Sequence, residues 1–312
     1  MTPLTTDTTP TTPPGLLRIG ELSRRHGVSP DLLRVWERRY GLLEPERSPG
    51  GFRLYTPKDE ERVRAMRRHL AQGFSAAVAA RMALRAPTPP PSSERQGAMD
   101  SALDELGAAL EAFQDVEAQA VLDRLLATFS VEAVLRDVVL PYLQRLGRRW
   151  EEGEISIGQE HFASAVLRGR LLGLARGFDV GVGPRALLAC PSGERHDLGL
   201  LCFGIGLREH GWRVTYLGAD SPIETIRDTA GRLDPDLVVV CAEREEPLDA
   251  VVHELRELSA AHPLALAGRG ASVETAHAAR ASLLQDAPMA AAARLASEWT
   301  SRGKVRETRP SG

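Results

Sequence analysis

The chain has 312 residues, of which 43% are hydrophobic and 26% are charged. This length and composition predict two or three globular domains and exclude a disulfide-stapled miniprotein. No apolar run approaches the roughly 20 residues that a membrane span needs, and the Thr- and Pro-rich N-terminus lacks the pattern of a secretory signal. The three cysteines form no C-x-x-C pair, which disfavours zinc and disulfide frameworks. We therefore expect a cytoplasmic protein with a disordered tail over residues 1–17.

The net charge of −3 hides an uneven distribution. Residues 18–85 contain fifteen Lys and Arg against eight Asp and Glu, which gives this part a net charge of +7. The first 17 residues contribute −1, so the remainder carries −9. A basic N-terminal part joined to an acidic body suggests a polyanion-binding module attached to domains with another task.

Two breaks divide the chain into three predicted modules. Prolines and serines crowd residues 86–93, which cannot continue a helix and are expected to form an extended linker. A second break, rich in glycine, lies between Gly177 and Pro184, just before the first strand-like run. The predicted parts are a tail over 1–17, a basic module over 18–86, a linker over 87–97, a second module over 98–178, a third over 184–302 and a tail over 303–312.

The second and third modules differ in their hydrophobic periodicity. The second has apolar residues at helical spacing throughout and is expected to be a four-helix bundle, with helices over 98–112, 116–128, 131–150 and 158–176. The third has short apolar runs separated by helix-length segments, at 186–190, 214–217, 237–240 and 264–267. This alternation predicts a doubly wound parallel sheet, in which ligands bind beyond the carboxyl ends of the strands.

The basic module begins with the pattern of two short helices joined by a tight turn. Residues 19–28 predict a helix that ends at Gly27, and Ser29 then caps a second helix over 29–40. The second helix is expected to place Leu32, Leu33, Trp36 and Tyr40 on one face and Arg34 and Arg38 on the other. This arrangement predicts a helix-turn-helix with a basic outer face.

A short hairpin is expected after the second helix. Residues 47–55 place a Gly-Gly turn between strand-like residues, which suits a β-wing. Because side chains alternate along a strand, Arg53 and Tyr55 are expected to face phosphates while Phe52 and Leu54 pack inward.

The whole segment resembles the DNA-binding domain of MerR-family transcription regulators. The matching residues are IGEL from Ile19, VSP from Val28, LRVWERRYGLL from Leu33 and GFRLY from Gly51. The resemblance implies a winged helix-turn-helix that dimerises on a palindromic operator and distorts it. The expected DNA contacts are Ser29, Arg34, Arg38, Arg39, Tyr40, Arg53 and Tyr55. The alternative is an unrelated helical domain whose arginines form a solvated face.

Many MerR proteins dimerise through a coiled coil directly after this domain. Here the proline-rich linker occupies that position, so assembly is expected to depend on the C-terminal modules. A homo-oligomer, either a dimer or a tetramer, is expected.

A short motif follows the first expected strand of the third module. Glu194-x-His196-x-x-Gly199 resembles the D-x-H-x-x-G signature of cobalamin-binding domains, with Glu in place of Asp. The resemblance implies that His196 is the lower axial ligand of cobalt, that Glu194 orients its imidazole, and that Gly199 leaves room for the nucleotide tail. Asp197, inside the motif, is also expected to contribute to the cofactor site. The alternative is a structural or solvent-facing histidine in a loop.

Two later elements of that family are present with departures. The S-x-L element falls on Cys241-Ala242-Glu243, and the Gly-Gly element falls near Gly268 and Gly270. A thiol is a poorer hydrogen-bond partner than a hydroxyl, so Cys241 puts the affinity for the tail in question.

The helical module carries the pattern W-x9-E-H, with Trp150 followed by Ile157, Glu160 and His161. This resembles the bundle of the adenosylcobalamin-dependent, light-sensing MerR repressors of the CarH and LitR type. The resemblance implies that these residues cover the upper face of the cofactor and accommodate its adenosyl group. The alternative is a core tryptophan beside an exposed Glu-His pair.

One departure affects the expected mechanism. In those light sensors a His that follows the Trp binds cobalt after photolysis, whereas here the residue is Glu151. A carboxylate cannot reproduce a bis-imidazole adduct, so the illuminated state is expected to use water or His161.

The resemblance covers roughly residues 18–302 and implies a repressor, not an enzyme. Adenosylcobalamin would bind between bundle and α/β module in the dark and drive oligomerisation on double-stranded operator DNA, and light would release the DNA. Two alternatives remain: a regulator that senses cobalamin supply or a partner protein without responding to light, and a corrinoid carrier for methyl transfer. No membrane partner is expected.

Overall fold

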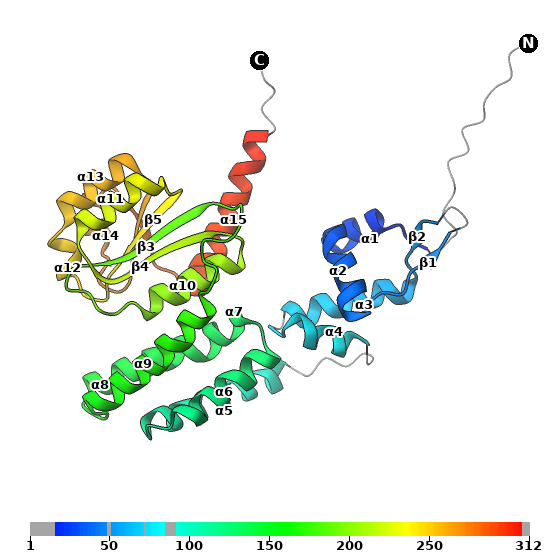
Figure 1. The fold of residues 1–312 in the computed structure, drawn as a ribbon, viewed down its shortest axis with the longest axis horizontal. Helices are drawn as coiled ribbons and strands as arrows, with labels where there is room; N and C mark the ends of the chain where they lie inside the picture. Colours follow the sequence, from blue (N-terminus) through cyan, green and yellow to red (C-terminus); the bar gives the residue numbers. More distant parts are fainter. Residues whose placement is uncertain (1–15, 49–50, 72, 85–91, 308–312) are drawn as a thin grey trace, which may run out of the picture. The chain divides into compact units, whose positions relative to one another are not determined.

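The computed structural model (Figure 1) describes residues 16–48, 51–71, 73–84 and 92–307. The chain divides into two units, Met1–Ala102 with Gln119–Val134 and Leu103–Ala118 with Leu135–Gly312. The boundary crosses two helices of the predicted bundle. The helical region is therefore shared between the units, although three separate modules were expected.

The first unit begins with the expected pair of helices. α1 (Ile19–His26) ends at Gly27, whose φ of 59° lies in the left-handed region that favours glycine. α2 (Pro30–Tyr40) begins after Ser29, whose hydroxyl accepts a hydrogen bond from the N–H of Leu32. The buried side chains of Leu22, Leu33 and Trp36 form the core of this pair of helices, which confirms the helix-turn-helix.

A two-stranded wing follows. β1 (Glu46–Arg47) and β2 (Arg53–Leu54) pair antiparallel. Of the expected Gly-Gly turn, Gly50 lies outside the described residues, and Gly51 has a φ of 77°. The wing is joined to α3 (Pro57–Ala71) through the buried carboxylate of Asp59, which accepts hydrogen bonds from the backbone N–H groups of Glu44 and Thr56. α4 (Ala76–Leu84) packs against α3.

The helical region contains the four expected helices with two differences. Its elements are α5 (Ser92–Glu111), α6 (Asp115–Thr128), α7 (Val131–Val134), the π-helical turn η1 (Leu135–Val139), α8 (Leu140–Glu151) and α9 (Ile157–Leu174). α5 begins inside the predicted linker over 87–97, because good helix formers follow its last proline. The third expected helix is interrupted by η1 just before Pro141, which cannot donate a backbone hydrogen bond to the preceding turn.

Within the second unit, the end of α5 is fastened to α8 and α9. Gly107 lies against the ring of Tyr142, and Arg149 forms an ion pair with Glu111. The side-chain amide of Gln159 donates to the carbonyl of Glu111 at 3.0 Å.

The rest of the second unit is the predicted parallel α/β domain. Its elements are β3 (Arg185–Pro191), α10 (Leu198–Glu209), β4 (Arg213–Ser221), α11 (Ile223–Leu233), β5 (Leu237–Cys241), α12 (Glu246–Asp249), α13 (Val252–Ala261), β6 (Leu264–Ala267), α14 (Val273–Ala278), β7 (Ser282–Leu284) and α15 (Pro288–Glu307). All neighbouring strands are parallel, in the order β4-β3-β5-β6-β7. The four predicted strands are confirmed, and β7 is an additional short strand.

Both faces of the sheet are covered, as Figure 1 shows. α10 and α15 bury one face, where Leu188, Phe203 and Ala292 belong to one core cluster. α11, α13 and α14 bury the other, where Ile226 and Leu255 pack against the strands. Burial on both sides explains why the strands are continuous apolar runs. Across the described ranges, every helix is too short or too polar to cross a lipid bilayer.

Candidate functional site

The strand order reverses at β3, which lies between β4 and β5. The chain runs from β3 to its neighbour β4 and then crosses back to β5 on the other side of β3. In doubly wound sheets, ligands bind where the strand order reverses, beyond the carboxyl ends of the strands. The loops that follow β3 and β5 meet at this point, because the backbone N–H of Glu243 donates to the carboxylate of Glu194 at 2.8 Å.

Glu194 is fully buried and holds the ring of His196. One carboxylate oxygen of Glu194 accepts hydrogen bonds from the backbone N–H of His196 at 2.8 Å and from its Nδ1 at 2.6 Å. Burial alone would raise the pKa of Glu194, but the hydrogen bonds from His196 and Glu243 outweigh it and lower the pKa. An ionised Glu194 requires the proton to be on Nδ1. In the neutral imidazole, Nε2 then carries a lone pair, on a side chain that is 64% exposed.

A carboxylate that holds one ring nitrogen of a histidine is an arrangement found at metal sites. A carboxylate bonded to one ring nitrogen fixes the tautomer and directs the other nitrogen at a metal. The donor set therefore fits a single axial imidazole ligand, the role predicted for His196.

Glycines shape the loops around His196 in two different ways. A methyl group built on Gly199 would meet no atom within 4 Å, so the space beside it is not filled by the protein. Methyl groups on Gly268 and Gly270 would instead collide with the backbone carbonyls of Ala242 and Arg244. Gly199 thus fits the role of leaving room for a ligand. Gly268 and Gly270 let the loop after β6 pack on the loop after β5, and their contact with a tail stays a prediction.

Cys241 lies at the end of β5 inside the core cluster that also contains Cys190. A hydrogen bond with the Cys241 thiol, together with burial, raises the pKa of Cys190 far above its ordinary value. Both cysteines are buried and Cys190 is held as a neutral thiol. The contact expected between Cys241 and a nucleotide tail stays a prediction.

The residues of the W-x9-E-H pattern lie at adjoining ends of α8 and α9. Trp150 is 47% exposed in the last turn of α8, and Ile157 is 64% exposed at the start of α9. A buried tryptophan was the alternative interpretation, and it is wrong. Large apolar side chains left in water at neighbouring helix ends fit a surface that a ligand covers.

The Glu-His pair forms a small polar network at the same end of α9. Glu160 accepts hydrogen bonds from Nδ1 of His161 and from the hydroxyl of Ser164, both at 2.7 Å. The ring of His161 is otherwise exposed. Its Nε2 therefore faces away from Glu160, and the expected contact of this pair with an adenosyl group stays a prediction.

Two ion pairs join α8 and α9 to the carboxyl edge of the sheet. Arg269, in the loop after β6, binds Glu243 at 2.8 Å and reaches Glu151 of α8 at 3.7 Å. Arg168 of α9 binds the carboxylate of Asp197 at 2.5 Å. The structure therefore brings the end of α8 and the middle of α9 to the same edge of the sheet as the motif around His196.

Asp197 contacts protein groups on both sides. It is buried, and its carboxylate accepts hydrogen bonds from Arg168 and from the hydroxyl of Tyr216 at 2.5 Å. Its expected direct contact with a cofactor stays a prediction.

The sequence did not predict three residues at this edge of the sheet, Arg168, Tyr216 and Arg269. Each of them contacts a partner that is distant in the chain. The one local signal was the spacing of Glu160, Ser164 and Arg168, which places an arginine on the same helix face as the motif.

In the first unit, the expected DNA-binding arginines lie on the outer face of α2. Arg34, Arg38 and Arg39 are all exposed. Arg34 forms an ion pair with Asp31 at 2.6 Å, while Arg39 lies over the ring of Tyr40 at 5.7 Å. These side chains form a basic surface suited to the phosphates of a duplex.

Two other expected contacts have structural roles as well. Ser29 uses its hydroxyl to cap α2, and Arg53 of the wing binds Glu37 of α2 at 3.0 Å. Arg53 remains partly exposed and fixes the wing to the helix that precedes it.

Leu32 was expected on the buried face of α2, but the structure leaves it exposed.

Tyr55 is fully buried, so its predicted contact with phosphate is wrong. Its backbone pairs with Leu17 in an isolated antiparallel bridge, and its hydroxyl donates to Glu37 at 3.1 Å. Burial and the nearby carboxylate raise its pKa to about 12. The expected alternation is also reversed at Phe52, which is 58% exposed, whereas Leu54 is buried as predicted.

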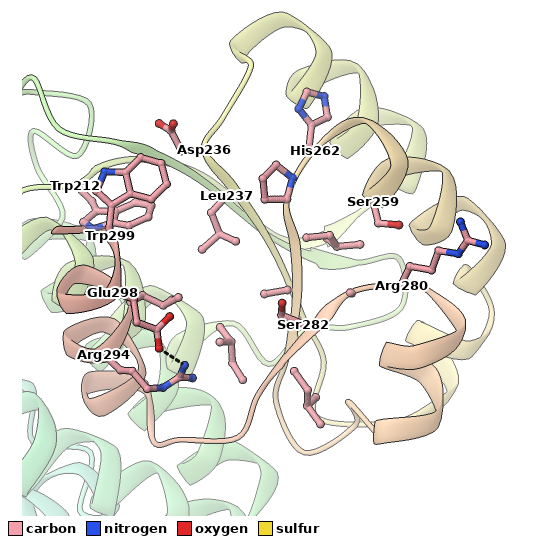
Figure 2. Close-up of a pocket in the computed structure, with 17 residues that line it drawn as sticks. Trp212, Asp236, Leu237, Ser259, His262, Arg280, Ser282, Arg294, Glu298 and Trp299 are labelled. Carbon is pink, nitrogen blue, oxygen red and sulfur yellow. Dashed lines mark hydrogen bonds and ion pairs between the residues drawn. The ribbon is translucent and has the colours of Figure 1, made fainter. Parts of the chain in front are cut away.

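A separate hollow of about 440 Å³ lies at the opposite edge of the sheet, and Figure 2 shows the side chains that line it. Leu237, Leu264 and Ser282, the first residues of β5, β6 and β7, line it together with Trp212 and Trp299. The two indole rings pack edge to face at 5.3 Å. Because it lies at the amino ends of the strands, this hollow is separate from the loop that carries His196.

Comparison with known families matches each part of the chain. The family described as "MerR HTH family regulatory protein" matches residues 17–85, and families described as "B12 binding domain" match residues 102–172 and 184–293. A MerR helix-turn-helix, a helical B12-binding domain and a parallel-sheet B12-binding domain define a class of multidomain regulator.

Individual relatives make the relationship more specific. The chain is 35% identical over 262 residues to the HTH-type transcriptional repressor CarA of Myxococcus xanthus, covering 82% of this chain and 87% of CarA. It is 32% identical over 259 residues to the HTH-type transcriptional repressor CarH of the same organism, covering 77% of this chain and 84% of CarH. The chain belongs to the family of CarA and CarH, the MerR-type transcriptional repressors with B12-binding domains. These relatives are regulators of transcription, as the sequence led us to expect of this chain.

A solved structure supports the fold of the C-terminal domains. The monomethylamine corrinoid protein of Methanosarcina barkeri has a TM-score of 0.53 and 16% sequence identity, over 64% of this chain and 98% of that protein. At this identity the likeness concerns the fold alone.

Proposed function

We propose that this chain is a transcriptional repressor that binds adenosylcobalamin. Light absorbed by the bound cofactor would lower its affinity for operator DNA, so that the repressor dissociates. The observation that carries the proposal is the pairing of His196 with buried Glu194 at the switch point of the sheet. This arrangement offers one imidazole nitrogen to a transition metal while the other is held by a carboxylate. Membership of the CarA and CarH family supports the same conclusion.

In this proposal, residues of the chain would contact the cofactor on both of its faces. His196 would hold the cobalt from below, with Gly199 leaving space beside it. Trp150 and Ile157 would cover the upper face, and Glu160 and His161 would lie beside the adenosyl group. When bound, adenosylcobalamin supplies a cobalt–carbon bond that visible light breaks.

The protein must convert this local event into a change in DNA affinity. In the dark, the bound form would associate into a dimer or tetramer and bring several helix-turn-helix modules to one operator, which raises affinity through multivalency. A light-induced shift of α8 and α9 would weaken that association. The switch requires the two assembly states to bind the intact cofactor with different affinity.

The first test uses purified full-length protein mixed with adenosylcobalamin in the dark and then desalted. We expect the absorption spectrum to show retained cofactor, and size-exclusion chromatography to show a large dark species that shrinks after green light. His196→Ala should lose the cofactor. His253→Ala is the matched control, because His253 is an exposed histidine on α13. Failure of the wild-type protein to retain cofactor would contradict the cobalamin proposal.

A second candidate function is a sensor of cobalamin supply that does not respond to light. It is favoured by Glu151, a carboxylate paired with Arg269 at the position next to Trp150. Retained cofactor without any light-dependent change in size would support this second function. The corrinoid carrier alternative is disfavoured, because a methyl carrier has no use for a MerR-type DNA-binding domain.

A further inference from the structure

Asp197 departs from the usual role of an aspartate at the start of a helix. It is the residue before α10, where an Asp side chain normally accepts a hydrogen bond from the first turn. Here its side chain makes no capping hydrogen bond. The carboxylate is instead turned to Arg168 and Tyr216, which approach it at 2.6 and 2.5 Å. A buried charge directed at two long side chains from other elements indicates a specific connection.

The partners of Asp197 come from two different elements of the second unit. Tyr216 lies on β4, and burial, followed by the hydrogen bond to Asp197, raises its pKa far above the ordinary range. Its phenol therefore stays protonated and donates. Arg168 lies on α9 and supplies the positive charge that compensates the buried carboxylate.

The position of Arg168 on α9 connects this ion pair to the upper side of the candidate site. Glu160, Ser164 and Arg168 are four residues apart in turn, so they share one face of the helix. Glu160 binds both His161 and Ser164. The same rigid helix thus carries the Glu-His pair at its start and the partner of Asp197 two turns later.

Asp197 is in turn adjacent to the lower side of the site. It directly follows His196, whose ring and backbone are held by Glu194. Asp197 shares a peptide bond with His196, so a movement of Asp197 would change the position of the His196 backbone and, with it, of the imidazole. The ion pair therefore connects the helix that carries the Glu160–His161 pair to the peptide next to His196.

We propose that Arg168 and Asp197 are positioning residues whose ion pair, completed by Tyr216, sets the spacing between α9 and the loop that carries His196. This inference rests on the proposed cobalamin function of the site. In this role the pair acts through α9 and through the loop of His196. It fixes the distance between the Glu160–His161 pair above and the imidazole of His196 below, so that both faces engage the cofactor together.

The test compares Arg168→Ala, Arg168→Lys and Asp197→Asn with the wild type in the full-length protein. Dissociation of adenosylcobalamin is followed in the dark, and the absorption spectrum reports whether imidazole remains on cobalt. We expect Arg168→Ala to speed dissociation by about tenfold or more, in line with the loss of other outer-shell partners of metal sites, and to reduce the imidazole-bound fraction. Arg168→Lys keeps the positive charge without the planar fork of the guanidinium. Its dissociation rate and imidazole-bound fraction should therefore lie between those of Arg168→Ala and the wild type.

Arg294→Ala is the matched control, because Arg294 forms ion pairs with Asp286 and Glu298 beside the distant hollow in Figure 2. It should leave dissociation and spectrum unchanged. In a double-mutant cycle, Arg168→Ala with Asp197→Asn should be no worse than the more severe single variant. Wild-type dissociation rates and spectra in both single variants would overturn the inference.

A measurement on the cofactor-free protein separates this inference from the proposed function. Hydrogen exchange of α9 and of residues 194–200 should become faster in Arg168→Ala and Asp197→Asn, and stay unchanged in Arg294→Ala. Should the alanine variant fail to fold, Asp197→Asn and Tyr216→Phe provide the same comparison. Unchanged exchange would overturn the inference even if the wild type binds cobalamin, and cofactor loss by the wild type alone would count only against the proposed function.

Discussion

The backbone N–H of Glu243 donates to the buried carboxylate of Glu194 at 2.8 Å. This hydrogen bond ties the loop after β5 to the loop that holds His196, and the side chain of Glu243 takes no part in it. Glu243 stands where the cobalamin-binding pattern expects Leu. Because the contact uses only the main chain, that departure leaves the support of Glu194 intact, and the Glu243 side chain is free to bind Arg269.

Replacing the carboxylate of Glu194 should weaken both binding and folding. Glu194→Ala leaves the partly buried backbone N–H groups of His196 and Glu243 without their acceptor, at a cost of about 1 kcal/mol each, the lower end of the range for a buried donor. It also frees the imidazole, which should lower cobalamin affinity by about 10- to 100-fold. Urea unfolding and cofactor titration measure the two effects. Glu224→Ala, an exposed glutamate on α11, is the control, and equal behaviour of the two variants would contradict this assignment.

The basic face of α2 should determine how DNA affinity depends on salt. Each of Arg34, Arg38 and Arg39 that contacts a phosphate contributes about one unit to the slope of log affinity against log salt. Arg38→Ala should therefore weaken binding to duplex DNA and reduce the slope by about one. Fluorescence anisotropy at several salt concentrations measures both quantities.

Two controls define that experiment. Arg227→Ala removes an exposed arginine of the α/β domain that pairs with Glu257, and it should leave the slope unchanged. Tyr55→Phe should also leave it unchanged, because Tyr55 is buried. A loss of slope in either control would show that the DNA-binding face has been placed on the wrong residues.

Tyr55 should make the first unit sensitive to alkaline pH. Its pKa is raised to about 12 by burial and by Glu37, against about 10 in an unfolded chain. A folded pKa above the unfolded value gives stability that is complete below pH 10 and is lost as pH rises towards 12. Tyr55→Phe has no phenol to ionise and should not show this loss. Unfolding free energies of both proteins at pH 8, 10 and 11 would show parallel curves if Tyr55 were an ordinary exposed tyrosine.

The architecture was predictable where local periodicity determines it. Strands buried on both faces are continuous apolar runs, and β6 was predicted with its observed bounds. β7 was missed, because it has three residues and its first side chain is exposed. The π-helical turn at 135–139 was also missed, since apolar spacing does not distinguish it from an α-helix.

The candidate site was predictable only as far as its motifs extend. His196, Glu194 and the exposed Trp150 follow short local patterns that the sequence displays. The burial of Tyr55 depends on Leu17, and the role of Asp197 depends on Arg168 and Tyr216, none of which is close in sequence. Contacts of this kind arise from tertiary packing, and no local propensity encodes them.

Glu151 provides the sharpest test of how this chain differs from light sensors that carry histidine there. Its carboxylate pairs with Arg269 at 3.7 Å, and a carboxylate is a poorer partner than imidazole for cobalt. Glu151→His should therefore give an illuminated protein with a longer-lived imidazole-bound absorption spectrum than the wild type. Glu152→His is the control, because Glu152 is an exposed neighbour just after α8. An unchanged spectrum and lifetime in Glu151→His would mean that the end of α8 does not face the cobalt, and the upper surface would then have to be assigned to His161 alone.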